Sequence, residues 1–169
     1  MSKKTFIVLL TVIICIIIAA IVLIISSLNK TGASAPADAV WCYERAAMLR
    51  DADEMLKYSS EYNNASLSEH CPPTVSLEDY LKNQYSGAAS AYRDTELSCK
   101  VISTKIYEDG ENAYVSLLSD YMSFVPDAKQ PESFALVKLE IYSDGARVLT
   151  YSGYAAKIGS RWYFYKPNN

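Results

Sequence analysis

The chain has 169 residues, and its formal net charge at pH 7 is −3. All nineteen acidic residues and thirteen of the sixteen basic residues follow residue 30, so that part carries a net charge of −6. The acidic excess lies in residues 31–96, which argues against nucleic acid or anionic lipid as a partner of that half, because both bind basic surfaces.

Residues 6–25 form an uninterrupted run without a charged side chain. A helix of that length spans about 30 Å, the thickness of the hydrocarbon core of a bilayer. We therefore expect a transmembrane helix over residues 5–28, with the lipid bilayer as a partner and residues 1–4 as a cytoplasmic tail. Because Lys3 and Lys4 precede the run, the positive-inside rule places the C-terminal domain outside a single-pass cell-membrane protein.

A cleaved signal peptide is the alternative interpretation of this segment. Residues 33–35 and 37–39 both have the A-x-A pattern of a cleavage site. The apolar core of a signal peptide is usually about 7–15 residues long, however, and this run is longer. Pro36 would also follow the first cleavage point, where proline is unsuitable, so we favour an uncleaved helix. After it we expect a linker over residues 29–37 and one extracytoplasmic domain over residues 38–169.

Three cysteines lie after the apolar run, at Cys42, Cys71 and Cys99. An odd number in an oxidising compartment indicates one disulfide and one remaining thiol. Cys71 lies in an expected loop beside two prolines, so Cys42–Cys71 is the favoured pair, and three reduced thiols are the alternative. No two cysteines have C-x-x-C spacing, and His70 is the only histidine, so we expect no metal site.

Two helices are expected in the first half of the domain. Apolar residues follow the three-four spacing of a helix over residues 38–58, and Asp38 is a suitable N-cap. A second helix is expected from an N-cap at Ser76, with Asp79 three residues later, to about Arg93.

The second half of the domain has the composition and alternation of strands, with hairpin signals at residues 109–110 and 144–145. Five strands are expected, over residues 97–107, 113–124, 134–142, 147–157 and 161–166. Helices followed by an antiparallel meander predict an α+β fold, in which the helices cover one face of the sheet.

The element order and several local motifs resemble the nuclear-transport-factor-2-like (cystatin-like) superfamily, especially its membrane-anchored bacterial extracytoplasmic branch. The matching motifs are residues 50–59, the predicted strands around residues 109–110, and the lysine, glycine turn and tryptophan-tyrosine ending of residues 156–163. The resemblance covers residues 38–166 and implies a curved, cone-like antiparallel sheet around the helices, with a possible pocket. The chain lacks the lipobox of the lipoprotein members.

An isomerase of this kind would need a carboxylate base and a tyrosine or protonated acid facing the cone. Asp120 and Tyr121 are adjacent on an expected strand, so their side chains would point to opposite faces. We therefore expect no catalytic residue and no cofactor. Side chains that could line a cavity are Tyr114, Tyr121, Tyr151 and Trp162, with Tyr154 and Tyr163 as further candidates.

Two classes of function remain. The favoured one is a membrane-anchored extracytoplasmic binding or assembly module without catalytic activity, whose partner is a protein or a cell-surface component. The resemblance offers one variant, the assembly subunit of type IV secretion or conjugation systems. The alternative is a small-molecule-binding protein or an isomerase-like enzyme that uses the cone pocket. A buried carboxylate beside a tyrosine hydroxyl inside the cone would favour this alternative, because fold alone does not choose a function.

Overall fold

The computed structural model describes residues 13, 16–17, 31–86 and 90–167. The chain divides into two compact units, residues 1–31 and residues 32–169, and the fold below is that of the second unit.

The described residues of the first unit are Thr31 and three isoleucines, Ile13, Ile16 and Ile17, which are helical and exposed. A membrane-spanning helix needs about twenty continuous, mainly apolar helical residues. Among the described residues, no helix is both long enough and apolar enough to cross a membrane. The transmembrane helix predicted over residues 5–28 is thus contradicted as part of the fold, although most of that range lies outside the described residues.

The helix predicted over residues 38–58 is two helices. Helix α2 (Pro36–Leu49) ends at Arg50, which has the left-handed backbone angles φ 60° and ψ 38°. A residue in this region cannot continue a right-handed helix, so the chain turns. Helix α3 (Ala52–Tyr58) then begins behind Asp51, whose side chain accepts a 3.0 Å hydrogen bond from the backbone N–H of Glu54.

Two further helices follow before the sheet. Helix α4 (Glu61–Ser68) has Ser60 as its N-cap. Helix α5 (Leu77–Ser86) begins behind Ser76, whose hydroxyl oxygen accepts a 3.1 Å hydrogen bond from the backbone N–H of Asp79. The predicted cap at Ser76 is confirmed, but the helix ends earlier than predicted.

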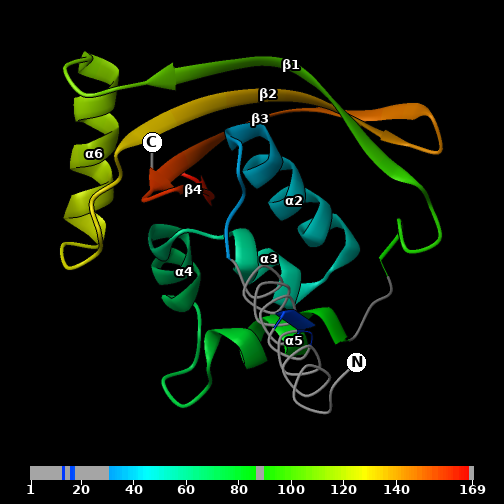
Figure 1. The fold of residues 1–169 in the computed structure, drawn as a ribbon. Helices are drawn as coiled ribbons and strands as arrows, with labels where there is room; N and C mark the ends of the chain where they lie inside the picture. Colours follow the sequence, from blue (N-terminus) through cyan, green and yellow to red (C-terminus); the bar gives the residue numbers. More distant parts are fainter. Residues whose placement is uncertain (1–12, 14–15, 18–30, 87–89, 168–169) are drawn as a thin grey trace, which may run out of the picture. The chain divides into compact units, whose positions relative to one another are not determined.

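In the described part of the chain, four strands form one antiparallel sheet in the order β1-β2-β3-β4 (Figure 1). The strands are β1 (Leu97–Tyr107), β2 (Ser133–Ser143), β3 (Ala146–Ile158) and β4 (Arg161–Tyr165). The α+β class with an antiparallel sheet is therefore as predicted, with one strand fewer.

The residues predicted as the strand over 113–124 form helix α6 (Asn112–Phe124) instead. Along the chain this helix follows β1 and precedes β2. Its buried residues Tyr114, Leu117 and Tyr121 recur at intervals of three and four, which is the period of a helix. The turn at residues 109–110 therefore leads into a helix, and β1 pairs with β2 instead of with residues 113–124. The strand prediction was wrong because the hairpin signal was given more weight than this spacing.

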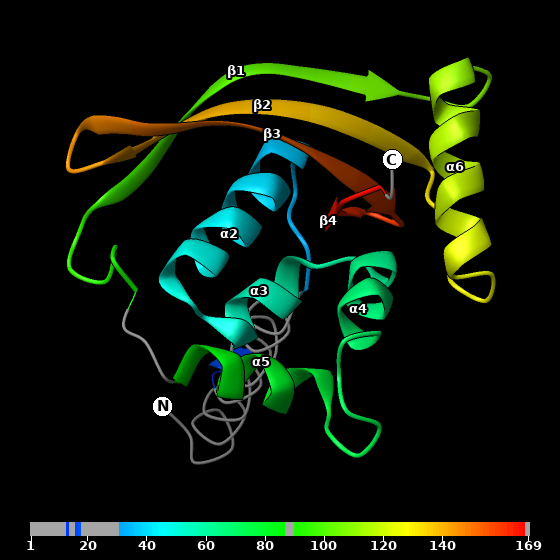
Figure 2. The same cartoon turned by 180° about the vertical axis from the view of Figure 1, so that it is seen from behind.

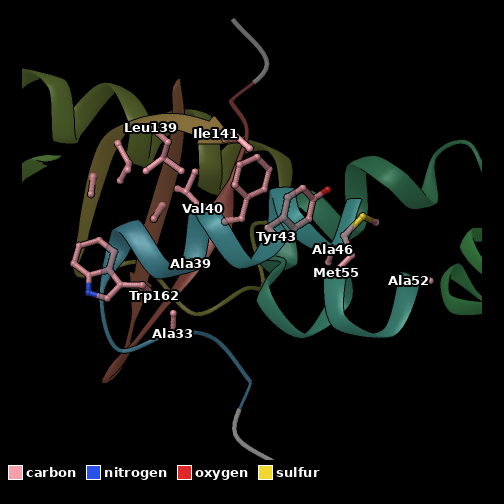
Figure 3. Close-up of a cluster of buried hydrophobic side chains, with 14 of the residues drawn as sticks. Ala33, Ala39, Val40, Tyr43, Ala46, Ala52, Met55, Leu139, Ile141 and Trp162 are labelled. Atoms are coloured by element: carbon pink, nitrogen blue, oxygen red, sulfur yellow. The ribbon is translucent and has the colours of Figure 1, made fainter. Parts of the chain in front are cut away.

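Helix α2 packs against one face of the sheet (Figures 1 and 2). Val40 and Tyr43 of this helix share a buried cluster with Leu139 and Ile141 of β2 and with Trp162 of β4 (Figure 3). A second cluster joins α4 and α6 to strand residues that are chain neighbours of those in the first cluster, including Phe134, Ala156 and Tyr165. Because neighbouring strand residues point to opposite faces, the two clusters lie on opposite faces of the sheet.

Part of the predicted linker over residues 29–37 is integrated into the domain. The backbone N–H of Gly32 donates a 2.8 Å hydrogen bond to the carbonyl of Lys57. Ala33 and Trp162 exchange two backbone hydrogen bonds of 2.8 and 2.9 Å. The folded unit therefore begins at Gly32, ahead of the boundary predicted at residue 38.

Candidate functional site

The four predicted pocket residues lie in three different places. Tyr114 and Tyr121 of α6 are both buried in the second cluster with Phe134. The Tyr114 hydroxyl donates a 3.0 Å hydrogen bond to the carbonyl of Pro131, and burial raises the pKa of Tyr121 to about 12. Trp162 is buried in the first cluster, on β4. Tyr151 alone of the four lines one of the cavities described here.

The cavity beside Tyr151 has a volume of about 290 Å³. It lies where β4 leaves the edge of β3, since the pairing of these strands starts at Tyr154 and Tyr165. Its inner wall is Phe164, which stacks on Tyr43 with ring centroids 3.9 Å apart. The remaining lining residues are Ser152, Gly153, Tyr154, Tyr165, Lys166 and Pro167.

Glu44 of α2 lies beside Tyr151 and is partly buried. Burial raises the pKa of the Glu44 carboxyl, while a hydrogen bond with Tyr151 and the positive charge of Lys166 lower it. Burial and the adjacent charge of Glu44 both raise the pKa of Tyr151. A carboxyl group therefore lies beside the tyrosine of a cavity wall, which is part of what the small-molecule alternative requires, but Tyr151 lines the cavity and Glu44 does not.

Sequence reasoning missed Glu44 because a glutamate on an amphipathic helix usually lies on the solvent side. The signal that could have revealed it is its position. Glu44 follows the buried Val40 by four residues and adjoins the buried Tyr43, so it lies at the edge of the apolar stripe of α2.

The interaction between the Glu44 carboxyl and the Tyr151 hydroxyl limits the chemistry that these two groups can perform. An enolising isomerase uses a free carboxylate as the base and a separate hydroxyl or acid as the donor to the developing oxyanion. Here the hydroxyl of Tyr151 and the carboxyl of Glu44 already interact with each other, since each shifts the pKa of the other. The arrangement suits the recognition of a polar group better than proton transfer.

A second carboxylate–tyrosine pair joins α6 to β4. The hydroxyl of Tyr165 donates a 2.5 Å hydrogen bond to the carboxylate of Asp120. Burial and this carboxylate raise the pKa of Tyr165. Asp120 lies on a helix, so the opposite-face argument made for a strand does not apply to Asp120 and Tyr121. The pair fixes α6 against the end of the sheet.

The predicted disulfide between Cys42 and Cys71 is wrong. In the described part of the chain Cys42, Cys71 and Cys99 are all free. The thiol of Cys71 donates a 3.6 Å hydrogen bond to the carbonyl of Leu67 at the end of α4, so it needs no disulfide partner. Burial, Asp38 and Cys42 all raise the pKa of Cys99, which indicates that Cys42 lies near β1.

Among the described residues, no group of three or more histidine, cysteine, aspartate or glutamate side chains could hold a metal ion.

A wider groove of about 480 Å³ runs between α3 and α5. The ammonium group of Lys82, which lines this groove, is 2.8 Å from the carboxylate of Asp53 and 2.5 Å from that of Glu78. The exposed pair of Lys82 and Asp53 joins α5 to α3 across the groove, and the pair of Lys82 and Glu78 lies within α5.

Strand β1 is an exposed edge of the sheet, and within the described residues it pairs with β2 alone. Val101, Ile102 and Ile106 are 47, 45 and 44% exposed, although each is a large apolar residue. The register shifts between Val101 and Ser103, so Ile102 is an extra, bulged residue. Eleven residues of edge strand thus combine unused backbone groups with uncovered apolar side chains.

No protein-family model, no curated protein and no solved structure matches this chain.

Proposed function

We propose that the domain of residues 32–167 is a protein-binding or assembly module without catalytic activity, and that β1 is its contact surface. The observation that carries this proposal is the exposure of Val101, Ile102 and Ile106 along an edge strand. A partner strand that pairs with such an edge gains backbone hydrogen bonds and covers the apolar side chains.

The edge also has features that oppose indiscriminate pairing. Natural sheets protect their edges with lysines and with bulges, and β1 has both, at Lys100, Lys105 and Ile102. Protection of this kind is compatible with selective binding, because a bulge and two positive charges restrict which strand can pair. The edge therefore favours a specific partner over self-association.

A small-molecule-binding protein or isomerase-like enzyme is the second candidate, and the pair of Glu44 and Tyr151 beside the cavity favours it. We rank it lower because Glu44 does not line the cavity and already interacts with Tyr151. The cavity of about 290 Å³ also lies at the lower end of the usual size of ligand sites.

The resemblance to the nuclear-transport-factor-2-like superfamily remains a proposal. It is supported by the order of the elements, with helices first, and by an antiparallel sheet whose inner face packs on α2. By this resemblance, the secretion assembly modules of the superfamily are the members whose role fits an exposed edge strand best.

The test is site-specific photo-crosslinking in the cells that make the protein. A photoreactive residue is placed at Ile102 or Ile106, and at the exposed Gln84 of α5 as the control. We expect a discrete protein adduct from both β1 positions and none from Gln84. Glu44→Gln should leave the adduct intact. Equal labelling at all positions would refute the proposal, as would a cellular defect that follows Glu44→Gln and not Ile102→Lys.

A further inference from the structure

We infer that the partner of β1 is an extended protein segment in which acidic and apolar side chains alternate. This inference rests on the proposed function and names the chemistry of its partner. It starts from the register of β1 on β2, because directly paired residues lie on the same face of a sheet.

The register separates the side chains of β1 into two rows. Val101 is paired with Leu139 and Ile106 with Ala135, and both β2 residues are buried under α2. Val101 and Ile106 therefore continue the inner face of the sheet beyond the cover of α2. An added strand would meet this row with apolar side chains, which would extend the existing core.

The other row lies on the outer face and is basic. Lys100 is paired with Glu140, Ser103 with Lys138, and Lys105 with Leu136. The carboxylate of Glu140 is shared among several groups: it accepts a 2.9 Å hydrogen bond from Tyr142 and a 3.0 Å hydrogen bond from Arg147, and the charge of Lys100 also lowers its pKa.

Counter-charges on this row are scarce. Residues 97–107 contain two lysines and no acidic residue, in a chain whose net charge is negative. Within the described part of the chain, Lys105 and Lys138 form no salt bridge. The Lys105 ammonium lies 4.9 Å from the ring centroid of Tyr107 and stays near the edge. Acidic side chains on an added strand would supply the missing charge.

A second copy of the chain fits this edge poorly. Pairing β1 with another β1 would bring together four lysines without one carboxylate, and like charges across a strand pair are destabilising. The bulge at Ile102 would also occur in both strands. A partner with its own acidic strand avoids the repulsion between lysines.

The test uses the full chain and three capped nine-residue peptides, in which valine alternates with glutamate, threonine or lysine. Affinity is measured by fluorescence polarisation, and the site by hydrogen exchange at the amides of β1. Two cross-strand charge pairs should make the glutamate peptide bind roughly 2- to 30-fold more tightly than the threonine peptide. The lysine peptide should bind most weakly, and the amides of β1 should become protected.

Two matched variants control for net charge. Lys100→Glu with Lys105→Glu should reverse the preference, so that the lysine peptide binds best. Lys129→Glu with Lys157→Glu changes the net charge equally, away from β1, and should keep the original order. The melting temperature of each variant is measured to establish that it is folded.

Each other outcome has a definite meaning. If the threonine peptide protects β1 as well as the glutamate peptide does, the acidic preference is wrong and the edge still docks strands. If β1 becomes protected on raising the protein concentration alone, the occupant is a second copy and the inference fails. If no peptide binds, the acidic partner is rejected. The proposed function is then judged separately, by the adducts at Ile102 and Ile106.

Discussion

Helix α2 approaches strand β3 closely at Gly153, and replacing this glycine by alanine tests that packing. A Cβ atom at this position would lie 2.7 Å from Cε1 of Tyr151, 3.0 Å from Cγ1 of Val40 and 3.1 Å from Cε2 of Phe164. All three distances are shorter than ordinary carbon–carbon contacts. The extra methyl group therefore requires movement of the helix, of two rings, or of all three.

The neighbours differ in their freedom to move. Val40 is fully buried, and Phe164 is buried and stacked on Tyr43. Tyr151 is half-buried and can shift, but a shift would weaken its hydrogen bond with Glu44. Overpacking of this kind typically costs about 1–3 kcal/mol. For a domain of this size, that loss corresponds to a melting temperature lowered by roughly 3–10 °C.

The assay is thermal and urea unfolding of Gly153→Ala beside Ser152→Ala, which changes an exposed neighbour on the same strand. The control should stay within about 0.5 kcal/mol of the unchanged protein. Combining Gly153→Ala with Val40→Ala should cost less than the sum of the two single changes, because the smaller side chain makes room. If Gly153→Ala unfolds like the unchanged protein, or if the two changes simply add, the close approach of α2 to β3 is wrong.

Three further predictions concern the carboxyl groups and the thiols. The pKa of Glu44 is raised from 4.5, so the stabilisation from its protonated form is complete below about pH 4.5 and is lost as the pH rises through the higher folded-state value. Urea unfolding from pH 4 to 7 should therefore show a smaller loss of stability in Glu44→Gln, and identical pH profiles would contradict the burial of this group. Tyr165→Phe should cost about 1.5–3 kcal/mol, because it removes a hydrogen bond to the carboxylate of Asp120. For free cysteines, the melting temperature should not change on adding reductant, and thiol titration should detect Cys71 as a free thiol. A reductant-sensitive transition would instead support the disulfide.

Local signals in the sequence were sufficient where one short motif decides the conformation. Ser76 and Asp79 hydrogen-bond to each other at the start of α5, as the capping pattern predicts. Asp144 and Gly145 have φ of 48° and 79° and join β2 to β3, as a two-residue hairpin turn requires. In both cases the cap or the turn itself is formed by residues that are neighbours in the chain.

The errors arose where two local signals disagreed. Residues 113–124 combine strand-forming residue types with a helical spacing of buried positions, and the packing of Tyr114 and Tyr121 against Phe134 favours the helix. Arg50 ends α2 in a left-handed conformation, although nothing in its residue type marks a turn. For residues 113–124, contacts with a segment far along the chain decide the outcome, and a single sequence does not show which segments will be in contact.

The candidate site was the least predictable part, for a related reason. Tyr151 was identified as a possible cavity residue, but Glu44 was not, because the two are separated by more than a hundred residues in the chain. Tyr114 and Tyr121 were identified for their residue type, and the structure uses both in a packed aromatic cluster. Residue type alone does not distinguish a tyrosine that lines a cavity from one that fills a core.

The same packing explains why the edge and the cavity differ as functional surfaces. Helix α2 covers the inner face of the sheet at Leu139, so there the strands form a closed core. Its cover is incomplete along β1, where Val101 and Ile106 lie on that same inner face and are exposed. At the cavity, by contrast, the polar groups of Tyr151 and Glu44 lie beside each other and interact. Along β1, uncovered apolar side chains lie beside unused backbone groups, and a macromolecular strand is a ligand with the shape to cover both.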